Sequence, residues 1–254
     1  MMEKNFDTLS NQQIISVRNL SKTFLLHLME GAVLPVVKNA SLTVDAGECV
    51  VLGGPSGAGK SSILKMIYGN YRVDTGCILV RHSCDMLGDG VMDVATAAPR
   101  QILRLRESTI GYVSQFLRVI PRVSALDIVQ AEVRDPAVFP EKRAKDLLTK
   151  LSIPERLWDL PPATFSGGEQ QRINIARGLA AAHKVLLLDE PTASLDRHNR
   201  EAVVELIKQK KSQGTAILAI FHDEDVRDEL ADRIVDVRDF APETTAHHLA
   251  NILE

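Results

Sequence analysis

Short apolar runs separated by charged, periodic segments make up most of this 254-residue chain. Residues 49–52, 110–113, 185–188 and 216–221 are almost wholly apolar, which predicts buried strands. Residues 14–20 and 40–44 alternate between apolar and polar side chains, which predicts half-buried strands. We also expect a strand over 77–80, an edge strand over 234–237, and a loop or hairpin over 25–34. Residues 83–96, rich in Gly and Asp, give no clear prediction.

The helical segments lie between these strands. Helices are predicted over 61–68, 100–106, 166–182, 197–211 and 242–254. Residues 124–158 are also helical in character, because Ala144, Leu147, Leu148 and Leu151 follow i, i+3, i+4, i+7 spacing. The chain is long enough for one large α/β domain, and we interpret the 124–158 stretch as part of a helical subdomain inserted into its core.

Composition and charge limit the classes of molecule and the compartment that suit this chain. The net charge of -3 provides no basic field for nucleic acid or an anionic membrane surface. The longest apolar runs are far too short to span a bilayer, so we expect no direct membrane insertion. Three cysteines without metal-ligand spacing fit a reducing cytoplasm, and Cys49 is expected to be a small core residue. Residues 1–13 form a polar extension with no signal-peptide pattern.

Residues 54–61 match G-x-x-x-x-G-K-[ST], the phosphate-binding loop, between a predicted strand and a predicted helix. Glycines let backbone N–H groups turn toward a phosphate, and the helix N-terminus adds partial positive charge. We expect Lys60 to reach the terminal phosphates and Ser61 to bind Mg²⁺. The alternative, a turn with a solvated lysine, does not account for the strand–loop–helix context.

Two carboxylates follow the apolar run 185–188. Parallel strands carry ligand-binding groups at their carboxyl ends, so we expect Asp189 to hold Mg²⁺ and Glu190 to act as the general base. Farther upstream, Ser166 and Glu169 form a capping-box pattern at the start of a helix. Gly167 and Gly168 between them lower helix stability, which favours close approach of an anion to the backbone.

With these motifs in order, the chain resembles the ATP-binding cassette family over residues 14–238. Ser166–Glu169 resemble its signature motif, Gln115 its Q-loop, Asp196 its D-loop, His222 its switch histidine, and Phe24 its adenine-stacking aromatic residue. The implied fold is a mainly parallel sheet with an antiparallel β subdomain and a helical subdomain over about 116–165, all within one domain over 14–254. The implied catalytic residues are Glu190, His222 and Gln115, and the implied Mg²⁺ ligands are Ser61, Gln115 and Asp189. The implied ATP contacts are Phe24, Gly54, Pro55, Ser56, Gly57, Ala58, Gly59, Lys60, Ser61, Ser62, Ser166, Gly167, Gly168, Glu169 and Asp196.

The family resemblance implies that two cassettes close head to tail on ATP, most simply as a homodimer. The linking sequences 114–122, 153–158 and 163–166, together with 221–224, resemble ATP-binding subunits of the carbon–phosphorus lyase system. That resemblance implies a cytoplasmic ATPase in an assembly that makes ribose 1-phosphonate 5-triphosphate during phosphonate catabolism. Its partners would be soluble lyase subunits, including a second ABC ATPase. One alternative is a transporter ATPase of the lipoprotein-release or macrolide-export type. Another is a non-catalytic nucleotide sensor, but the presence of Glu190, the expected general base, argues against an inactive site.

Overall fold

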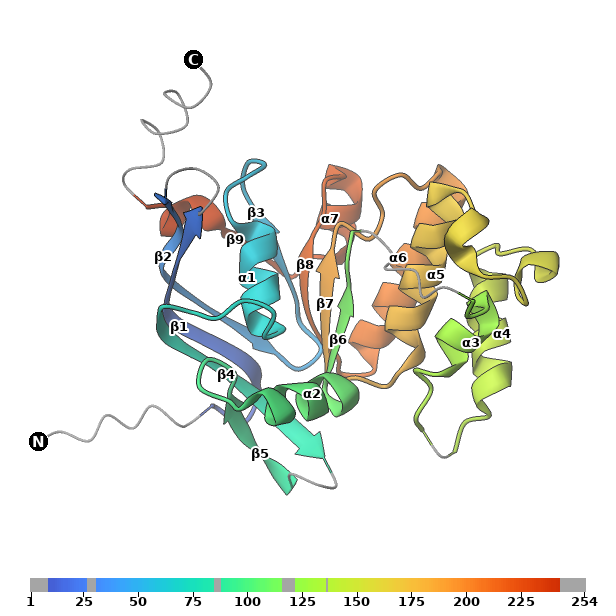
Figure 1. Cartoon of the computed structure of the whole chain (residues 1–254), viewed down its shortest axis with the longest axis horizontal. Helices are drawn as coiled ribbons and strands as arrows, with labels where there is room; N and C mark the ends of the chain where they lie inside the picture. The colour runs from blue at the N-terminus through green and yellow to red at the C-terminus, as the bar shows by residue number, and fades with distance from the viewer. Residues whose placement is uncertain (1–8, 27–30, 85–87, 116–121, 136, 243–254) are drawn as a thin grey trace, which may run out of the picture.

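The computed structural model describes residues 9–26, 31–84, 88–115, 122–135 and 137–242. In this part of the chain, one sheet has strands in the order β6-β7-β8-β3-β9, all paired in parallel (Figure 1). The strands are Ile110–Val113 (β6), Val185–Asp189 (β7), Ala216–Ile220 (β8), Cys49–Gly53 (β3) and Arg233–Asp236 (β9). Every residue of β7 and β8 is buried, as expected for parallel strands covered on both faces. The four predicted apolar strands are therefore confirmed, and β9 lies at the edge as predicted.

A second sheet is antiparallel, with the strand order β2-β1-β4-β5. Its strands are Gln13–Leu26 (β1), Ala32–Asp45 (β2), Thr75–Cys84 (β4) and Gly88–Asp93 (β5). β1 and β2 are much longer than the alternating patterns predicted. Register shifts interrupt their pairing, and Asn19 (φ 49°) and Asn39 (φ 55°) adopt left-handed backbone, so the apolar alternation breaks although the ladder continues.

The helices cover both faces of the parallel sheet (Figure 1). The helices are Lys60–Ile67 (α1), Pro99–Ser108 (α2), Ala125–Gln130 (α3), Pro140–Lys150 (α4), Gly167–Ala180 (α5), Arg197–Ser212 (α6) and Glu224–Leu230 (α7). Short 3-10 turns cover Glu155–Leu157, Pro162–Thr164 and Val237–Phe240. Helices α1 and α2 share one core with the antiparallel sheet, whereas α3 to α7 share the other. The sequence patterns did not predict α7, and the helix expected over 242–254 lies almost entirely outside the described residues.

Successive residues of the parallel strands face these two cores in turn. On β7, Val185 and Leu187 pack toward α1 and the antiparallel sheet, while Leu186 and Leu188 pack toward α5 and α6. Cys49 on β3 is fully buried, as predicted, and burial raises the pKa of its thiol to about 12.

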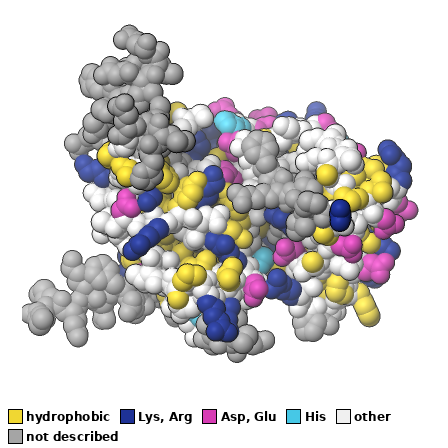
Figure 2. Space-filling view, viewed as in Figure 1, with side chains coloured by type: hydrophobic (Ala, Val, Ile, Leu, Met, Phe, Trp, Pro, Cys, Tyr) yellow, Lys and Arg dark blue, Asp and Glu magenta, His cyan; other side chains and the backbone are white. Residues whose placement is uncertain are grey.

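On the face of the molecule shown in Figure 2, basic and acidic side chains are interspersed.

Candidate nucleotide site

The predicted site residues follow the carboxyl ends of neighbouring parallel strands. The loop after β3 carries the phosphate-binding sequence, β6 leads to Gln115, β7 ends in Asp189 before Glu190, and β8 leads to His222. Parallel strands place all their carboxyl ends at one edge of the sheet, which is the upper edge in Figure 1. Sheet topology therefore gathers residues that are up to 168 positions apart in the sequence, from Gly54 to His222.

The phosphate-binding loop requires its glycines. Gly59 has φ +91°, and a Cβ there would lie 3.0 Å from both the Val36 carbonyl oxygen and Val36 Cγ1. Helix α1 begins directly after it, with no side-chain cap and no acidic residue in its first turn. Its first N–H groups are therefore oriented toward the loop, the arrangement that binds phosphate at a helix N-terminus. Lys60 Nζ donates to the carbonyl oxygens of Gly54 and Pro55, each at 2.7 Å, so the ammonium lies across the loop.

Asp189 is buried, and its two carboxylate oxygens have different partners. Ser61 Oγ donates to Oδ1 at 2.8 Å, and Tyr112 Oη donates to Oδ2 at 2.9 Å. Burial, followed by the charge of Asp189 and the bond to it, raises the pKa of Tyr112 far above its ordinary range. The hydroxyl and carboxylate oxygens fit Mg²⁺, which prefers such ligands and keeps waters and substrate phosphates in its shell. Among the described residues, no three His, Cys, Asp or Glu side chains gather to form a complete metal site.

Glu190 brings the three predicted catalytic residues together. Gln115 Nε2 donates to Glu190 Oε2 at 3.0 Å, and His222 Nε2 lies 3.0 Å from Oε1. The Glu190 side chain is 15% exposed, against 66% for His222, so the carboxylate is shielded while the imidazole faces solvent. Glu190 adopts left-handed backbone at φ +54°, an uncommon conformation for a residue with a Cβ. Gln115 thus contacts the Glu190 carboxylate, and its role as a metal ligand stays a prediction.

The signature sequence opens α5 with a capping box. Ser166 Oγ accepts from the Glu169 N–H at 3.3 Å, and Glu169 Oε2 accepts from the Ser166 N–H at 2.9 Å and from its hydroxyl at 2.7 Å. These bonds hold the pKa of Glu169 below its usual range. A Cβ on Gly167 would have no neighbour within 4 Å, and one on Gly168 would make only ordinary contacts. Packing within the chain therefore does not require these glycines, which favours contact with a group from outside it.

The structure does not bring the signature sequence to the phosphate-binding loop of the same chain. Helix α1 packs in the core that includes the antiparallel sheet, and α5 packs in the core on the opposite face of the parallel sheet (Figure 1). The two helices that begin at these motifs therefore lie on opposite faces of the sheet.

The last two predicted contacts have structural partners within the chain. Asp196 caps α6 by accepting from the Asn199 backbone N–H at 2.9 Å and from Asn199 Nδ2 at 2.8 Å, and these bonds lower its pKa. The Phe24 ring meets the Tyr71 ring edge-on with centroids 5.1 Å apart, and Lys22 Nζ lies 5.2 Å from the Phe24 centroid. Roles for Asp196 and Phe24 toward a nucleotide stay predictions.

Two contacts at the site were not predicted from the sequence. The Tyr112 bond to Asp189 could have been suspected, because a phenol stands three residues before Gln115 in an otherwise apolar strand. Arg200 bonds to the carboxylate of Asp223, the residue after His222, and its Nη2 donates to the Leu195 carbonyl at 3.4 Å. Arg200 thereby joins the loop before α6 to the loop after β8.

A family model described as ABC transporter matches residues 37–193. The chain belongs to this ATP-binding family. Its architecture is accordingly the ABC nucleotide-binding-domain fold, as the motifs predicted. The matched region runs from β2 past the phosphate-binding loop, the signature helix and β7.

Similar proteins include ATPases of several systems. The lipoprotein-releasing system ATP-binding protein LolD of Maricaulis maris is 38% identical over 85% of this chain and 90% of LolD. The uncharacterized ABC transporter ATP-binding protein YvrO of Bacillus subtilis is 33% identical over 89% of this chain and 94% of YvrO. The macrolide export ATP-binding/permease protein MacB of Brucella abortus is 36% identical over 89% of this chain but only 33% of MacB. The chain thus spans about a third of the length of these MacB relatives.

A solved dimer of the ATP-binding cassette MJ0796, described as a post-hydrolysis state bound to ADP and Pi, has a TM-score of 0.76 at 28% identity. The match covers 88% of this chain and 94% of that cassette. A second dimeric structure of the same cassette matches with the same TM-score.

Proposed function

We propose that this chain binds ATP with Mg²⁺ and hydrolyses it in a homodimer, driving conformational work in a partner. One observation carries the proposal: both oxygens of the Glu190 carboxylate have a partner, Gln115 on one side and His222 on the other. This group adjoins Asp189, which is bonded to Ser61 of the phosphate-binding loop. The phosphate, metal and water-activating groups predicted separately thus lie along one edge of the sheet.

The loop residues would hold the phosphates. Lys60 exchanges its two carbonyl partners for phosphate oxygens, which are stronger acceptors because they are charged. Mg²⁺ neutralises developing charge on the phosphates when it is bound, with Ser61 and Asp189 as its protein ligands. The N–H groups at the start of α1 complete the cradle.

Glu190 would take the proton of the attacking water. Its carboxylate is shielded from solvent, and Gln115 and His222 orient it. One oxygen can therefore accept the proton while the side chain keeps its position. The His222 side chain is exposed, so it can move away and leave Glu190 Oε1 without this contact. Positioned general bases of this kind contribute about 10²–10⁴-fold to rate.

The separation of the two motifs supports the homodimer. Because α1 and α5 cover opposite faces of the sheet, we assign Ser166 and the two adjacent glycines to a nucleotide held by another chain. The open space around the Gly167 Cα leaves room for that approach. The dimeric assembly of the similar cassette MJ0796 supports the same arrangement.

The similar proteins favour a membrane transporter as the assembly in which this chain works. LolD and MacB are named for lipoprotein release and macrolide export, which supports the alternative function better than the carbon–phosphorus lyase prediction. No helix among the described residues is long and apolar enough to cross a bilayer. The proposed partner is a membrane permease, on which the chain would act from the cytoplasmic side.

A carbon–phosphorus lyase assembly is the second candidate. It rests on the resemblance of the linking sequences, of which 153–158, 163–166 and 221–224 fall among the described residues and 116–121 do not. In that case the same ATP cycle would act on soluble lyase subunits, and those subunits would carry the phosphonate chemistry.

Hydrolysis and partner identity are tested separately. The purified chain should release phosphate from ATP only when Mg²⁺ is present. If it binds ATP but does not hydrolyse it, the chain is a nucleotide sensor and not an ATPase. Affinity-tagged chain captured from phosphate-starved cells, with and without detergent, should bring down an integral membrane permease. Capture of soluble phosphonate-pathway subunits would favour the lyase assembly over the transporter.

A further inference from the structure

The second carboxylate oxygen of Asp189 accepts a hydrogen bond from Tyr112, a residue to which neither the motifs nor the family model assign a role. Tyr112 Oη donates to Asp189 Oδ2 at 2.9 Å, while Oδ1 accepts from Ser61. β6 and β7 run in parallel with Tyr112 beside Leu187, so the phenol points along the same sheet face to Asp189, two residues farther on. A hydrogen bond to an ionised carboxylate is shorter and stronger than one between neutral groups.

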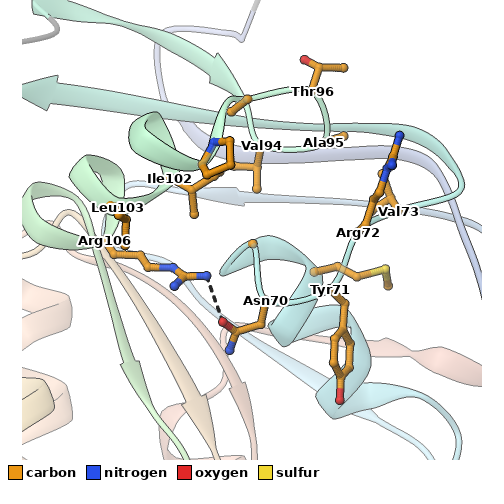
Figure 3. Close-up of a pocket in the computed structure, with 14 residues that line it drawn as sticks. Asn70, Tyr71, Arg72, Val73, Val94, Ala95, Thr96, Ile102, Leu103 and Arg106 are labelled. Atoms are coloured by element: carbon orange, nitrogen blue, oxygen red, sulfur yellow. Dashed lines mark hydrogen bonds between the residues drawn. The ribbon is translucent and has the colours of Figure 1, made fainter.

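The Tyr112 ring is itself held in place. Its centroid lies 5.0 Å from that of Tyr68, and the Arg106 guanidinium covers Tyr68 at 4.3 Å from its centroid. Arg106 Nε donates to the Tyr68 carbonyl at 2.9 Å. Arg106 Nη2 donates to Asn70 Oδ1, also at 2.9 Å (Figure 3). Three side chains from α2, the end of α1 and β6 thus form one stack that ends at the carboxylate.

The far end of this stack forms part of the wall of a cavity of about 720 Å³ between the end of α1 and α2 (Figure 3). Arg106 lines that cavity, whereas Tyr112 does not. The stack therefore runs from the cavity wall to the Asp189 carboxylate, where the Tyr112 hydroxyl donates its hydrogen bond. A tyrosine needed only for packing would not need its hydroxyl at Asp189.

We propose that Tyr112 is a positioning residue for Asp189, fixing the rotation of the carboxylate so that Oδ1 faces Ser61 and the bound metal. The proposal rests on the proposed function, because it gives Asp189 a role only where Mg²⁺ accompanies ATP. Without the hydroxyl, the carboxylate loses its partner on Oδ2 and can rotate, and binding that depends on the metal weakens. Binding of the nucleotide alone does not involve this oxygen and is preserved.

The test compares Mg²⁺-dependent and Mg²⁺-independent nucleotide binding. In a Glu190→Gln background, which slows hydrolysis, the affinity for fluorescent mant-ATP is measured with Mg²⁺ and with EDTA. Tyr112→Phe should reduce the gain in affinity from Mg²⁺ by about tenfold, the factor equivalent to about 1.4 kcal/mol and typical of one hydrogen bond to a charged group. Its affinity in EDTA should stay within about twofold of the parent. Tyr71→Phe, which removes the hydroxyl of a tyrosine that lines the cavity instead, is the matched control and should change neither value.

Two outcomes would overturn the role of Tyr112: an unchanged gain from Mg²⁺, or equal weakening with and without the metal. If the parent itself shows no gain from Mg²⁺, the proposed function fails instead. A spectroscopic readout covers the case in which Tyr112→Phe does not fold. The chain has three tyrosines, so 3-fluorotyrosine labelling gives three ¹⁹F signals, and Tyr68→Phe and Tyr71→Phe assign the third by elimination. The Tyr112 signal should shift on adding ATP with Mg²⁺ and much less with EDTA; no difference would contradict the proposal.

Discussion

His222 Nε2 lies 3.0 Å from Glu190 Oε1, so the second residue after β8 contacts the residue after β7 at the edge of the sheet. This contact places the imidazole where it can orient the carboxylate or release it. In the proposed function the two residues share one task, activation of the attacking water. The catalytic assignment therefore depends first on the Glu190 carboxylate.

Replacing Glu190 with Gln should abolish most hydrolysis while leaving ATP binding intact. Gln keeps the size of the side chain and a carbonyl oxygen near His222, but it cannot accept the proton of water. Turnover should fall by about 10²–10⁴-fold, the usual scale for general-base catalysis. Phosphate release and mant-ATP binding are measured together, with Glu224→Gln on exposed α7 as the matched control. Unchanged turnover in Glu190→Gln would remove Glu190 from the role of base.

Mixed dimers test whether the ATP site is shared between chains. Lys60→Ala damages the phosphate-binding loop, and Ser166→Arg damages the signature start of α5. A mixed dimer of the two variants keeps one intact composite site, built from the unaltered loop of one chain and the unaltered signature of the other. In a Glu190→Gln background, ATP should stabilise the mixed dimer but neither homodimer, as measured by size-exclusion chromatography with light scattering. If wild-type loops and signatures give an ATP-stabilised dimer and the mixture does not, the site lies within one chain.

The segment 116–122 after Gln115 is predicted to dock the partner. Residues 116–121 lie outside the described part of the chain; Arg122 is described and exposed, with left-handed backbone at φ +66°. Arg118→Glu combined with Arg122→Glu should weaken co-purification with the partner and leave basal hydrolysis largely intact. Reversed charge at an interface rim slows association and changes its salt dependence. Lys142→Glu with Lys150→Glu on α4 is the matched control. Equal co-purification of the double variant and wild type at low and high salt would exclude the segment from the interface.

Buried Lys210 predicts an unusual dependence of stability on pH. Its Nζ donates to the Ala181 carbonyl at 2.6 Å, and burial, with a smaller effect of the Arg143 charge, lowers its pKa to about 8. The unfolded lysine titrates near its ordinary value of about 10.4. Between these two values the unfolded chain binds the extra proton, so the stability contributed by this residue rises with pH through that window.

Lys210→Met should therefore stabilise the fold at neutral pH by about 2–3 kcal/mol, the size of this pKa difference, minus the lost hydrogen bond. Its advantage over wild type should shrink from pH 8 to pH 10.5. Urea unfolding at these pH values measures both effects, with Lys142→Met at an exposed position of α4 as the control for loss of a lysine charge. An advantage that grows with pH would contradict the assigned direction.

The sequence predicted the parallel sheet and most of the site because both depend on local signals. The apolar runs of β3, β6, β7 and β8 and the glycines of the phosphate-binding loop are such signals. The lengths of β1 and β2 were underestimated, because left-handed Asn19 and Asn39 shift the register where a period-two pattern is expected to hold. Helix α7 was missed because only Val226 and Leu230 of its short span are buried.

The contacts that orient the site could not be predicted in this way. The Tyr112 bond to Asp189 joins residues 77 positions apart, and its geometry depends on the pairing of β6 with β7. The use of Arg200 to join two loops likewise depends on how α6 packs beside α7. Residue type, spacing and the family resemblance named the candidate reacting groups, whereas the tertiary structure revealed the side chains that contact them.

If the ATP site is shared between chains as we propose, the placement of α1 and α5 on opposite faces of the parallel sheet would make hydrolysis second-order in protein concentration. A single chain would then carry half of each of two sites, so at low abundance the number of working sites would grow with the square of the number of chains. Below the dissociation constant of the dimer, doubling expression would about quadruple total ATP consumption. Few copies would consume almost no ATP, and the cell could set the energy cost of this protein through gene dosage alone.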